Sequence, residues 1–374
     1  MKNSIKKILI THSSNDNYGA SKILISIVDI FIKNGYDIYL ILPSNGPLNN
    51  NRIIKKTELT IINLGVFRKK YLNIFGLINR LYFIIKSSLY IKSFLKKNKI
   101  DLVYINTSTI ISPTIAAKFA GIPSLYHIHE IPKSNSTYAR FITVFLNNFS
   151  RNVICVSKSV KEFWIQKGVN QNKLEIINNG FIFKNIKPKV FNKEKIIFTS
   201  ISRIIPYKGH TLLIELFDAL FKKNNKIQLQ IVGDTLPQYQ KYLNDLKLNI
   251  KKKGIDDRIM FLGFRNDISY ILTNSNFFIH TPIFPDPFPT VIFEAIQAKT
   301  PVITNDLGGA YEILNNGKNG LLIKNELINE SVDKILTFIE SHELQKKNTE
   351  SAFNYVCKNF SLENFEKKII RIIG

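Results

Sequence analysis

The sequence predicts an α/β fold made of two domains, each built on a parallel β-sheet. Short apolar runs typical of strands alternate with longer helix-like segments along the whole chain, which is the pattern of parallel α/β sheets. The chain has 374 residues, more than the roughly 250 at which a single hydrophobic core stops growing. Because 45% of the residues are hydrophobic, two substantial cores can form.

The strand-like runs fall into two sets separated by a lysine-rich segment without periodicity. The first set comprises residues 5–11, 37–43, 59–65, 100–108, 123–130, 151–157 and 174–180. The second comprises residues 195–202, 227–234, 258–264, 276–282 and 300–306. We therefore place the domain boundary at Lys187. The predicted domains are residues 1–187 and 188–358, followed by a helix over 359–374 that could return to the first domain.

The chain ends and cysteines indicate a reducing, cytoplasmic environment. Cys155 and Cys357 are too few and too far apart for a disulfide framework, and both are expected to be buried thiols. The apolar run Ile8–Ile10 is much shorter than the core of a signal peptide. No run of about 18 uncharged apolar residues occurs, so no transmembrane helix is expected.

Positive charge is concentrated in the first half of the chain. The net charge is +24, and residues 1–190 contain 28 Lys and Arg against 8 Asp and Glu. Such a field favours an anionic ligand or surface on that side. No nucleic-acid recognition motif accompanies it, so nucleic acid is not an expected partner.

One basic segment, residues 68–99, is also rich in Phe, Tyr, Leu and Ile. A basic amphipathic helix of this composition can lie on an anionic membrane while its lysines reach the headgroups. The alternative is a long helix that packs on the sheet with solvated lysines. The sequence leaves both open, and the charge of the first domain favours membrane contact.

In the second domain, Arg203 and Lys208 follow a predicted strand and precede an apolar helix. A guanidinium and an ammonium at a strand end suit the two phosphates of a diphosphate leaving group. The alternative is a pair of solvated surface charges.

The stretch "FPDPFPTVIFEAIQAKTPVITND" places two acids around a predicted helix start near Thr290. The free N–H groups of a helix N-terminus attract phosphate. Asp286 precedes this helix and Glu294 lies within it, so both acids can contact one ligand. A role for acids in stabilising the helix dipole explains Asp286 tolerably but not Glu294, which lies between apolar neighbours.

These motifs together resemble the family 4 glycosyltransferases. The resemblance rests on R-x4-K-G, then G-D, then D-x7-E, then "TNDLGGAYEILNNGKNGLLI", and covers roughly residues 196–323. It implies the GT-B fold, with two Rossmann-like domains whose parallel sheets face a central cleft. It also implies a retaining, metal-independent enzyme without a cofactor that uses a nucleotide-sugar donor. Similar enzymes build bacterial surface polysaccharides, including lipopolysaccharide, on glycan or lipid-linked acceptors at the inner face of the cell membrane.

The resemblance also assigns roles to residues of the second domain. Arg203 and Lys208 would hold the donor diphosphate, Glu294 the ribose hydroxyls and Asp286 the transferred sugar, where the family usually has a glutamate. Backbone amides would bind sugar and phosphate oxygens at Phe288, Thr290 and Val291. Pro289 replaces a usual glycine and has no N–H to donate, so the donor sugar is not assigned.

Glycine-bearing turns complete the expected donor site. Gly233 and Asp234 would lie near the base and ribose, or simply end a strand. Gly308 and Gly309 would form a wall of the site, although a purely structural role is favoured for both. In the first domain, Gly19 would let the backbone approach the diphosphate.

The strand ending in "YHIHE" predicts a histidine site in the first domain. His127 and His129 alternate along the strand and therefore share a face, while Ile128 points away. By resemblance, His129 contacts the donor sugar near the reacting carbon, with His127 as the alternative and Glu130 beside them. A zinc pair is the other interpretation, but no further His or Cys has fitting spacing. His12 is expected to be a polar residue that ends its strand.

Two further turns of the first domain are assigned by resemblance. Asn179 and Gly180 would line the cleft. The turn at Ser157 is similar to a related turn of the family, with a helix cap at Ser157 as the strong alternative.

Three other functions remain possible from the sequence. A nucleotide-sugar epimerase would act without an acceptor, and a phosphorylase would need inorganic phosphate. A non-enzymatic basic membrane-binding protein with a degenerate donor site would not bind nucleotide sugars at all.

Overall fold

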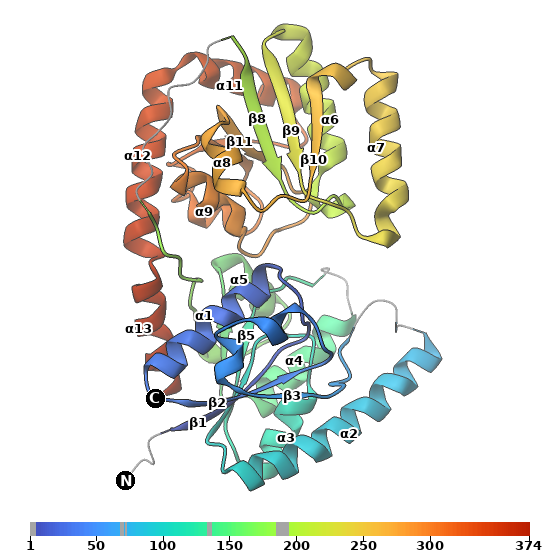
Figure 1. Ribbon diagram of the computed structural model, residues 1–374, viewed down its shortest axis with the longest axis vertical. Coiled ribbons are helices and arrows are strands. Elements are labelled where there is room, and N and C mark those ends of the chain that lie inside the picture. Colours follow the sequence, from blue (N-terminus) through green and yellow to red (C-terminus); the bar gives the residue numbers. More distant parts are fainter. Residues whose placement is uncertain (1–4, 68–70, 72, 133–136, 185–193) are drawn as a thin grey trace. The chain divides into compact units, whose positions relative to one another are not determined.

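The computed structural model describes residues 5–67, 71, 73–132, 137–184 and 194–374. It divides into two compact units (Figure 1). The N-terminal unit contains Met1–Gly180 and Leu362–Gly374, and the C-terminal unit contains Phe181–Ser361. The boundary predicted at Lys187 lies outside the described residues. The last thirteen residues belong to the N-terminal unit, the return that the sequence analysis considered for the C-terminal helix.

The N-terminal unit has a seven-stranded parallel sheet in the order β3-β2-β1-β4-β5-β6-β7. Each of the seven predicted strand runs overlaps one of these strands. Their bounds are β1 Lys7–Thr11, β2 Asp37–Leu42, β3 Glu58–Ile61, β4 Leu102–Ile105, β5 Ser124–Ile128, β6 Asn152–Cys155 and β7 Leu174–Ile176. The central strands are apolar on both faces, as expected for a sheet covered by helices on both sides.

Six α-helices belong to the described part of this unit. They are α1 Gly19–Lys33, α2 Ile74–Asn98, α3 Ser112–Ala120, α4 Thr137–Phe149, α5 Lys158–Gln166 and α13 Leu362–Ile373. The apolar residues of α13 recur at helical spacing and are buried, which explains why this segment packs on the N-terminal unit. Asn34 at the end of α1 donates to Glu366 of α13 over 2.7 Å. The Ser157 hydroxyl accepts from the Val160 N–H, so Ser157 is a helix cap.

The C-terminal unit has a six-stranded parallel sheet in the order β10-β9-β8-β11-β12-β13. The bounds are β8 Ile196–Ile201, β9 Ile227–Val232, β10 Ile259–Gly263, β11 Phe277–His280, β12 Val302–Asn305 and β13 Leu321–Ile323. Five of these strands were predicted. The sequence analysis missed β13 because its three apolar residues are too few to give a strand signal.

Seven α-helices surround this second sheet in the described residues. They are α6 His210–Lys223, α7 Gln240–Lys252, α8 Ile268–Thr273, α9 Thr290–Gln297, α10 Gly309–Ile313, α11 Ile328–Glu340 and α12 His342–Asn359. Aromatic rings form the centre of the core, where Phe198 of β8 stacks on Phe277 of β11 with ring centroids 4.9 Å apart.

The expectation that both cysteines are buried thiols needs correction. Cys155 is buried and burial raises its pKa to about 12, but Cys357 is only half-buried. Among the described residues, α2 is long and apolar enough to cross a membrane, with a mean hydropathy of 1.3 over 18 residues. Only 33% of that window is buried. Scattered basic residues interrupt this helix, so it contains no long uncharged run.

Candidate active site

The strand order places a ligand site at the same position in each unit. In both sheets the first strand is internal, and the chain builds the sheet outward on either side of it. Ligands of open α/β sheets bind beyond the carboxyl ends of the two strands where this order reverses. These strands are β1 and β4 in the N-terminal unit and β8 and β11 in the C-terminal unit.

In the C-terminal unit, an ion pair joins the loops that follow β8 and β11. Lys208, at the end of the short helix Pro206–Lys208, donates through Nζ to Oδ2 of Asp286. Their side chains retain 23% and 14% of their exposure. The structure therefore brings together one predicted diphosphate ligand and the predicted sugar ligand.

His280 adds a third polar group to this pair. It ends β11, is buried, and its Nε2 lies 3.6 Å from Asp286 Oδ2. Burial lowers the pKa of His280, and the nearby carboxylate offsets this only in part. Burial would raise the pKa of Asp286, but the Lys208 charge and His280 outweigh it and hold that pKa well below its usual value. Beside Lys208, Asp286 is therefore a carboxylate and His280 a neutral imidazole.

The adjacent glycines Gly308 and Gly309 hold the Asp286 loop in place by close backbone packing. The Gly309 N–H donates to the Asp286 carbonyl over 2.8 Å. A Cβ at Gly308 would lie 2.2 Å from that carbonyl oxygen, and one at Gly309 would lie 2.3 Å from the Pro287 carbonyl oxygen. This geometry supports the structural role favoured for both glycines.

The loop after β9 also depends on glycine. Gly233 has φ +134°, and a Cβ there would lie 1.9 Å from the Ser202 carbonyl oxygen. The Asp234 carbonyl accepts from the Ile204 N–H, and its exposed carboxylate accepts from the Thr235 N–H. Gly233 therefore has a structural role beside the predicted binding role. Asp234, which follows β9, contacts the loop after β8 that carries Arg203.

The start of α9 matches the predicted phosphate-binding helix. Pro289 is the N-cap residue, and no side chain among the described residues caps the helix. The N–H groups of Thr290 and Val291 are thus available in the first turn. Glu294 follows on the same helix and is partly buried. The side chain of Phe288 packs in the core against Phe293, so only its amide can serve the site.

Arg203 is exposed on the loop after β8, five residues before Lys208. Arg203 and Lys208 therefore lie on the same loop after β8, as predicted from the sequence.

In the N-terminal unit, a hydrogen-bonded histidine network lies at the corresponding position. His12 follows β1, and its Nδ1 lies 3.2 Å from the Asn106 carbonyl oxygen. Asn106 follows β4 and accepts through Oδ1 from His129 Nε2 over 2.9 Å. On its other side, His12 Nε2 lies 3.3 Å from the Ser21 hydroxyl, which donates to Asp16. The loops after three strands are thereby connected.

Burial keeps the histidines of this network neutral. It lowers the pKa of His12 to about 4 and that of His129 well below its usual value. The rings of His127 and His129 lie 4.2 Å apart, so the prediction that they share a face is confirmed. His127 Nδ1 lies 2.6 Å from the Tyr104 hydroxyl, and burial lowers the His127 pKa to about 3.

Glu130 is turned toward the loop after β4. It accepts from the Thr107 hydroxyl over 2.5 Å and from the Ser108 N–H over 3.2 Å. Burial raises its pKa, and these hydrogen bonds offset the effect only in part. Its contacts are those of a residue that positions this loop. Among the described residues, no group of three or more His, Cys, Asp or Glu side chains is arranged to hold a metal ion.

The remaining predicted residues of this unit differ in their surroundings. A Cβ at Gly19 would meet no atom within 4 Å, so the start of α1 borders open space. Asn179 is buried, and its Oδ1 has no hydrogen-bond partner among the described residues. It follows β7 directly before Gly180, the last residue of the first segment of this unit.

The sequence analysis missed three residues that the geometry makes central. They are the buried polar side chains of His280 in the C-terminal unit and of Asn106 and Tyr104 in the N-terminal unit. His280 and Asn106 share one signal, because each ends or directly follows an apolar strand that borders the point where strand order reverses. His12 was noted, but its contacts to two loops were not foreseen.

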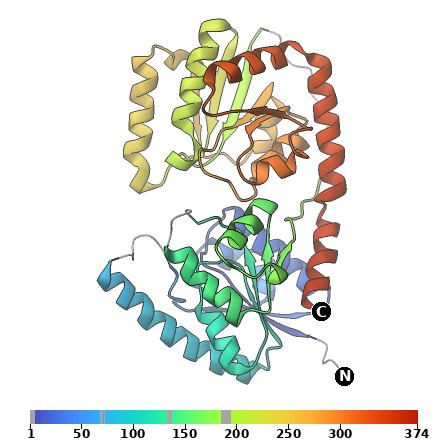
Figure 2. The same cartoon turned by 180° about the vertical axis from the view of Figure 1, so that it is seen from behind.

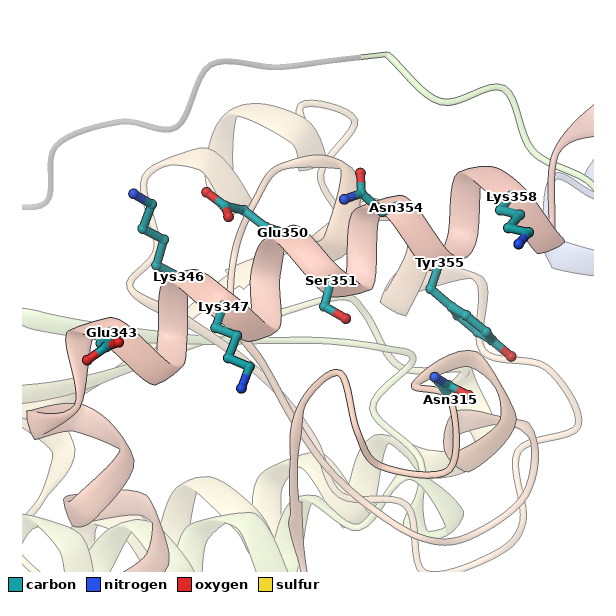
Figure 3. A pocket seen from close by; sticks show the side chains of 9 residues that line it. All are labelled: Asn315, Glu343, Lys346, Lys347, Glu350, Ser351, Asn354, Tyr355 and Lys358. Atoms are coloured by element: carbon teal, nitrogen blue, oxygen red, sulfur yellow. The ribbon is translucent and has the colours of Figure 1, made fainter.

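A separate hollow of about 690 Å³ lies along α12 (Figure 3). Its lining includes Ser351 and Tyr355 on the side of the helix that faces Asn315. It contains none of the residues assigned to the donor site.

Comparison with known proteins agrees with this geometry. A family model described as "Glycosyltransferase Family 4" matches residues 18–182, and one described as "Glycosyl transferases group 1" matches residues 181–355. The two matches follow one another and leave only the chain ends uncovered. The chain belongs to the family 4 glycosyltransferases. Its fold is GT-B, and it is a glycosyltransferase enzyme.

Two relatives of this glycosyltransferase have defined activities. The UDP-Gal:alpha-D-GlcNAc-diphosphoundecaprenol alpha-1,3-galactosyltransferase of Escherichia coli is 29% identical over 289 residues, 69% of this chain and 73% of that protein. The poly(ribitol-phosphate) alpha-N-acetylglucosaminyltransferase of Staphylococcus aureus is 26% identical over 197 residues. The second match spans 52% of this chain but only 38% of the relative.

Solved structures show the same fold over the whole chain. Anabaena Alr3699/HepE, crystallised with UDP and glucose, is 25% identical with a TM-score of 0.81, and the match covers 99% of both chains. The lipopolysaccharide outer core galactosyltransferase WaaB has a TM-score of 0.74 at 16% identity, covering 98% of this chain and all of that one.

Proposed function

We propose that this glycosyltransferase transfers a hexose from a nucleotide-sugar donor to a lipid-linked glycan during surface polysaccharide synthesis, with retention of anomeric configuration. The observation that carries the proposal is the part-buried Lys208–Asp286 pair at the carboxyl edge of the C-terminal sheet. A cation held at this edge beside an uncapped helix start is suited to a diphosphate.

The two units contribute different groups to this function. In the C-terminal unit, Arg203, Lys208 and the first N–H groups of α9 would bind the donor diphosphate, while Glu294 would bind the ribose. Asp286 would bind sugar hydroxyls through the carboxylate oxygen not used by Lys208. In the N-terminal unit, neutral His129 would offer an uncharged hydrogen bond near the reacting carbon.

The chemistry consists of charge stabilisation at the leaving group. The bond between the anomeric carbon and the diphosphate oxygen breaks as the acceptor hydroxyl bonds to the same face of that carbon. The acceptor proton passes to the departing phosphate oxygen. Arg203, Lys208 and the α9 N-terminus stabilise the negative charge that develops, and removing one such donor typically costs about 100- to 1,000-fold in rate.

The proposal includes no metal and no cofactor. The positive charge that a divalent ion supplies to diphosphates elsewhere would come from the side chains of Arg203 and Lys208. The UDP-Gal donor of the Escherichia coli relative and the UDP bound to Alr3699/HepE support a UDP-sugar, and the diphosphoundecaprenol acceptor of the Escherichia coli relative supports a glycan on a polyprenyl diphosphate. With such an acceptor, the enzyme would act in the cytoplasm, peripherally bound to the inner face of the membrane.

The test is a transfer assay with the purified full chain, UDP-hexoses and a sugar linked to a polyprenyl diphosphate. We expect a disaccharide product whose anomeric proton shows the same configuration as the donor, formed equally well with EDTA. An inverted product would contradict retention, and loss of transfer with EDTA would contradict metal independence.

Omitting reactants distinguishes the rival functions. Conversion of the nucleotide sugar without acceptor would indicate an epimerase, and a requirement for inorganic phosphate would indicate a phosphorylase. A thermal-shift screen that finds no stabilisation by any nucleotide sugar would indicate a non-enzymatic protein with a degenerate site.

A further inference from the structure

Over its first half, helix α2 turns most of its apolar side chains outward, while its buried positions include Gly76 and Arg80. Its buried positions follow one stripe and are Gly76, Arg80, Ile84, Ser87, Ser88, Ile91 and Leu95. In an ordinary surface helix the buried stripe is the apolar one. Over the first half of α2 this relation is reversed.

The buried stripe holds α2 against the rest of the N-terminal unit through close packing and polar contacts. The Ser88 hydroxyl donates to the Ser112 carbonyl of α3 over 3.2 Å. The Arg80 guanidinium lies 3.8 Å above the ring of Tyr71. A Cβ at Gly65 would lie 2.7 Å from Ile84. These contacts fix which face of α2 is turned away from the unit.

The outward face is a continuous apolar surface, which we call the α2 face. Its members are all at least 48% exposed and are Ile74, Phe75, Leu77, Ile78, Leu81, Tyr82, Ile85 and Leu89. Phe75 is 85% exposed. Single exposed apolar residues are common on proteins, but a contiguous group of this kind marks an interaction site. Figures 1 and 2 both show α2 at the outer edge of the unit, with its first turns extending beyond α3 and α4.

Charge identifies the partner of the α2 face. Residues 68–99 contain nine Lys and Arg and no Asp or Glu. Lys86, Lys96 and Lys97 are exposed on the second half of α2, and Lys92 lies 5.9 Å from the exposed ring of Phe119 on α3. A second copy of the chain would bring like charges together, whereas anionic lipid headgroups neutralise them.

We propose that the α2 face inserts into the interfacial layer of an anionic membrane, with α2 parallel to the membrane surface and its lysines at the headgroups. The inward polar stripe remains on α3, so the helix does not leave the unit to span the bilayer. This deepens the peripheral location included in the proposed function, but it concerns lipid binding alone and stands whether or not sugar transfer is found.

The first experiment measures insertion by fluorescence of the full chain. The single native tryptophan, Trp164, is buried and gives a constant background. With Phe75→Trp, we expect a blue shift and stronger emission on adding vesicles of phosphatidylglycerol and phosphatidylethanolamine, and little change with phosphatidylcholine alone. Tyr270→Trp, at a position 69% exposed in the C-terminal unit, should show no shift. Equal shifts for both variants, or none for Phe75→Trp, would overturn the proposal.

The second experiment measures binding by vesicle flotation. Phe75→Asn with Ile78→Asn should weaken binding to the anionic vesicles at least about tenfold, because two large apolar groups no longer leave water. The control, Leu248→Asn with Tyr270→Asn, removes two large side chains that are 57% and 69% exposed in the C-terminal unit and should bind as the native chain does. Lys86→Gln and Lys96→Gln should each weaken binding about fivefold. Native-like binding by the Phe75/Ile78 variant would overturn the proposal.

Two further results would contradict membrane-surface binding and indicate that the α2 face has another partner. Light scattering that finds a dimer in the native chain and a monomer in the Phe75/Ile78 variant would indicate a second copy. Retention in cell membranes after alkaline carbonate extraction would indicate a spanning helix. We expect a monomer or an unchanged oligomer in the first measurement, and release from the membrane in the second.

Discussion

Lys208 and Asp286 lie 78 positions apart in the chain, yet their side chains form an ion pair in the C-terminal unit. The pair connects the loop after β8 to the loop after β11, the two strands at which the strand order of this sheet reverses. A positive charge is thus held at the edge where α/β sheets bind ligands. The loop that contains Asp286 leads directly into the start of α9.

A double-mutant cycle tests the coupling of this pair. Asp286→Asn leaves the part-buried Lys208 without its counter-charge. Lys208→Met leaves the part-buried Asp286 without its counter-charge. Each single change should lower the free energy of unfolding by about 1–3 kcal/mol, and the double change by less than the sum. Urea unfolding measures all four proteins. Strictly additive values would mean that the pair contributes no coupling in solution.

Glu294→Gln tests the predicted ribose contact. The side chain keeps its size while losing its charge, so the melting temperature should change little. The kcat/KM for transfer should fall by about tenfold or more, because hydrogen bonds to a charged acceptor are the stronger ones. Glu330→Gln, an exposed glutamate paired with Lys334 on α11, is the control and should transfer normally. Equal activity of the two variants would contradict the role of Glu294.

Alanine substitutions at two glycines should differ in their effect on stability. Gly309→Ala places a Cβ 2.3 Å from the Pro287 carbonyl oxygen, so the Asp286 loop must shift and stability should fall. Gly19→Ala meets no protein atom within 4 Å and should leave the melting temperature unchanged. If the donor diphosphate approaches this turn, Gly19→Ala should nevertheless weaken UDP binding. Native-like stability of Gly309→Ala would contradict the packing argument.

Acid should destabilise the N-terminal unit through its buried histidines. Burial lowers the pKa of His127 to about 3 and that of His12 to about 4 in the folded protein, against about 6.5 for an exposed histidine. As the pH falls below 6.5, the unfolded chain binds protons that the folded chain does not. Each histidine therefore removes up to about 1.4 kcal/mol of stability per pH unit, until the pH reaches its folded pKa.

His127→Gln provides the check on this pH dependence. Fluorescence of Trp164, the only tryptophan and a residue of α5, follows unfolding of the N-terminal unit. Between pH 6 and pH 4, the variant should lose stability less steeply than the native chain by about one proton equivalent. Identical slopes would show that His127 does not titrate differently in the folded and unfolded states.

The strands and the donor loops could be predicted because their signals are local. Apolar runs gave all seven strands of the first sheet, and a proline-rich loop before an apolar run gave the start of α9 at Thr290. The three-residue strand β13 could not be found this way, since its position depends on pairing with β12. The family resemblance supplied roles for Lys208 and Asp286, but not the ion pair between them.

Long-range contacts explain what the sequence analysis missed. In the sequence, nothing distinguishes Asn106 from other residues that follow a strand. Its hydrogen bond with His129 depends on the position of β5 in the sheet. The role of His280 depends on the loop after β11, because this loop brings Asp286 close to the His280 ring. The face of α2 that is buried also depends on tertiary contacts, because neither its composition nor its periodicity indicates an inward stripe of Gly, Arg and Ser.

Calorimetric titration with UDP tests the central claim most directly, because it measures diphosphate binding without requiring the acceptor. The native chain should bind UDP, and Lys208→Ala should weaken binding by about tenfold or more through loss of a charge-assisted contact. Lys222→Ala removes an exposed lysine of α6 that pairs with Asp218, and it should bind as the native chain does. Equal affinities for all three proteins would contradict the assignment of Lys208 to the donor diphosphate.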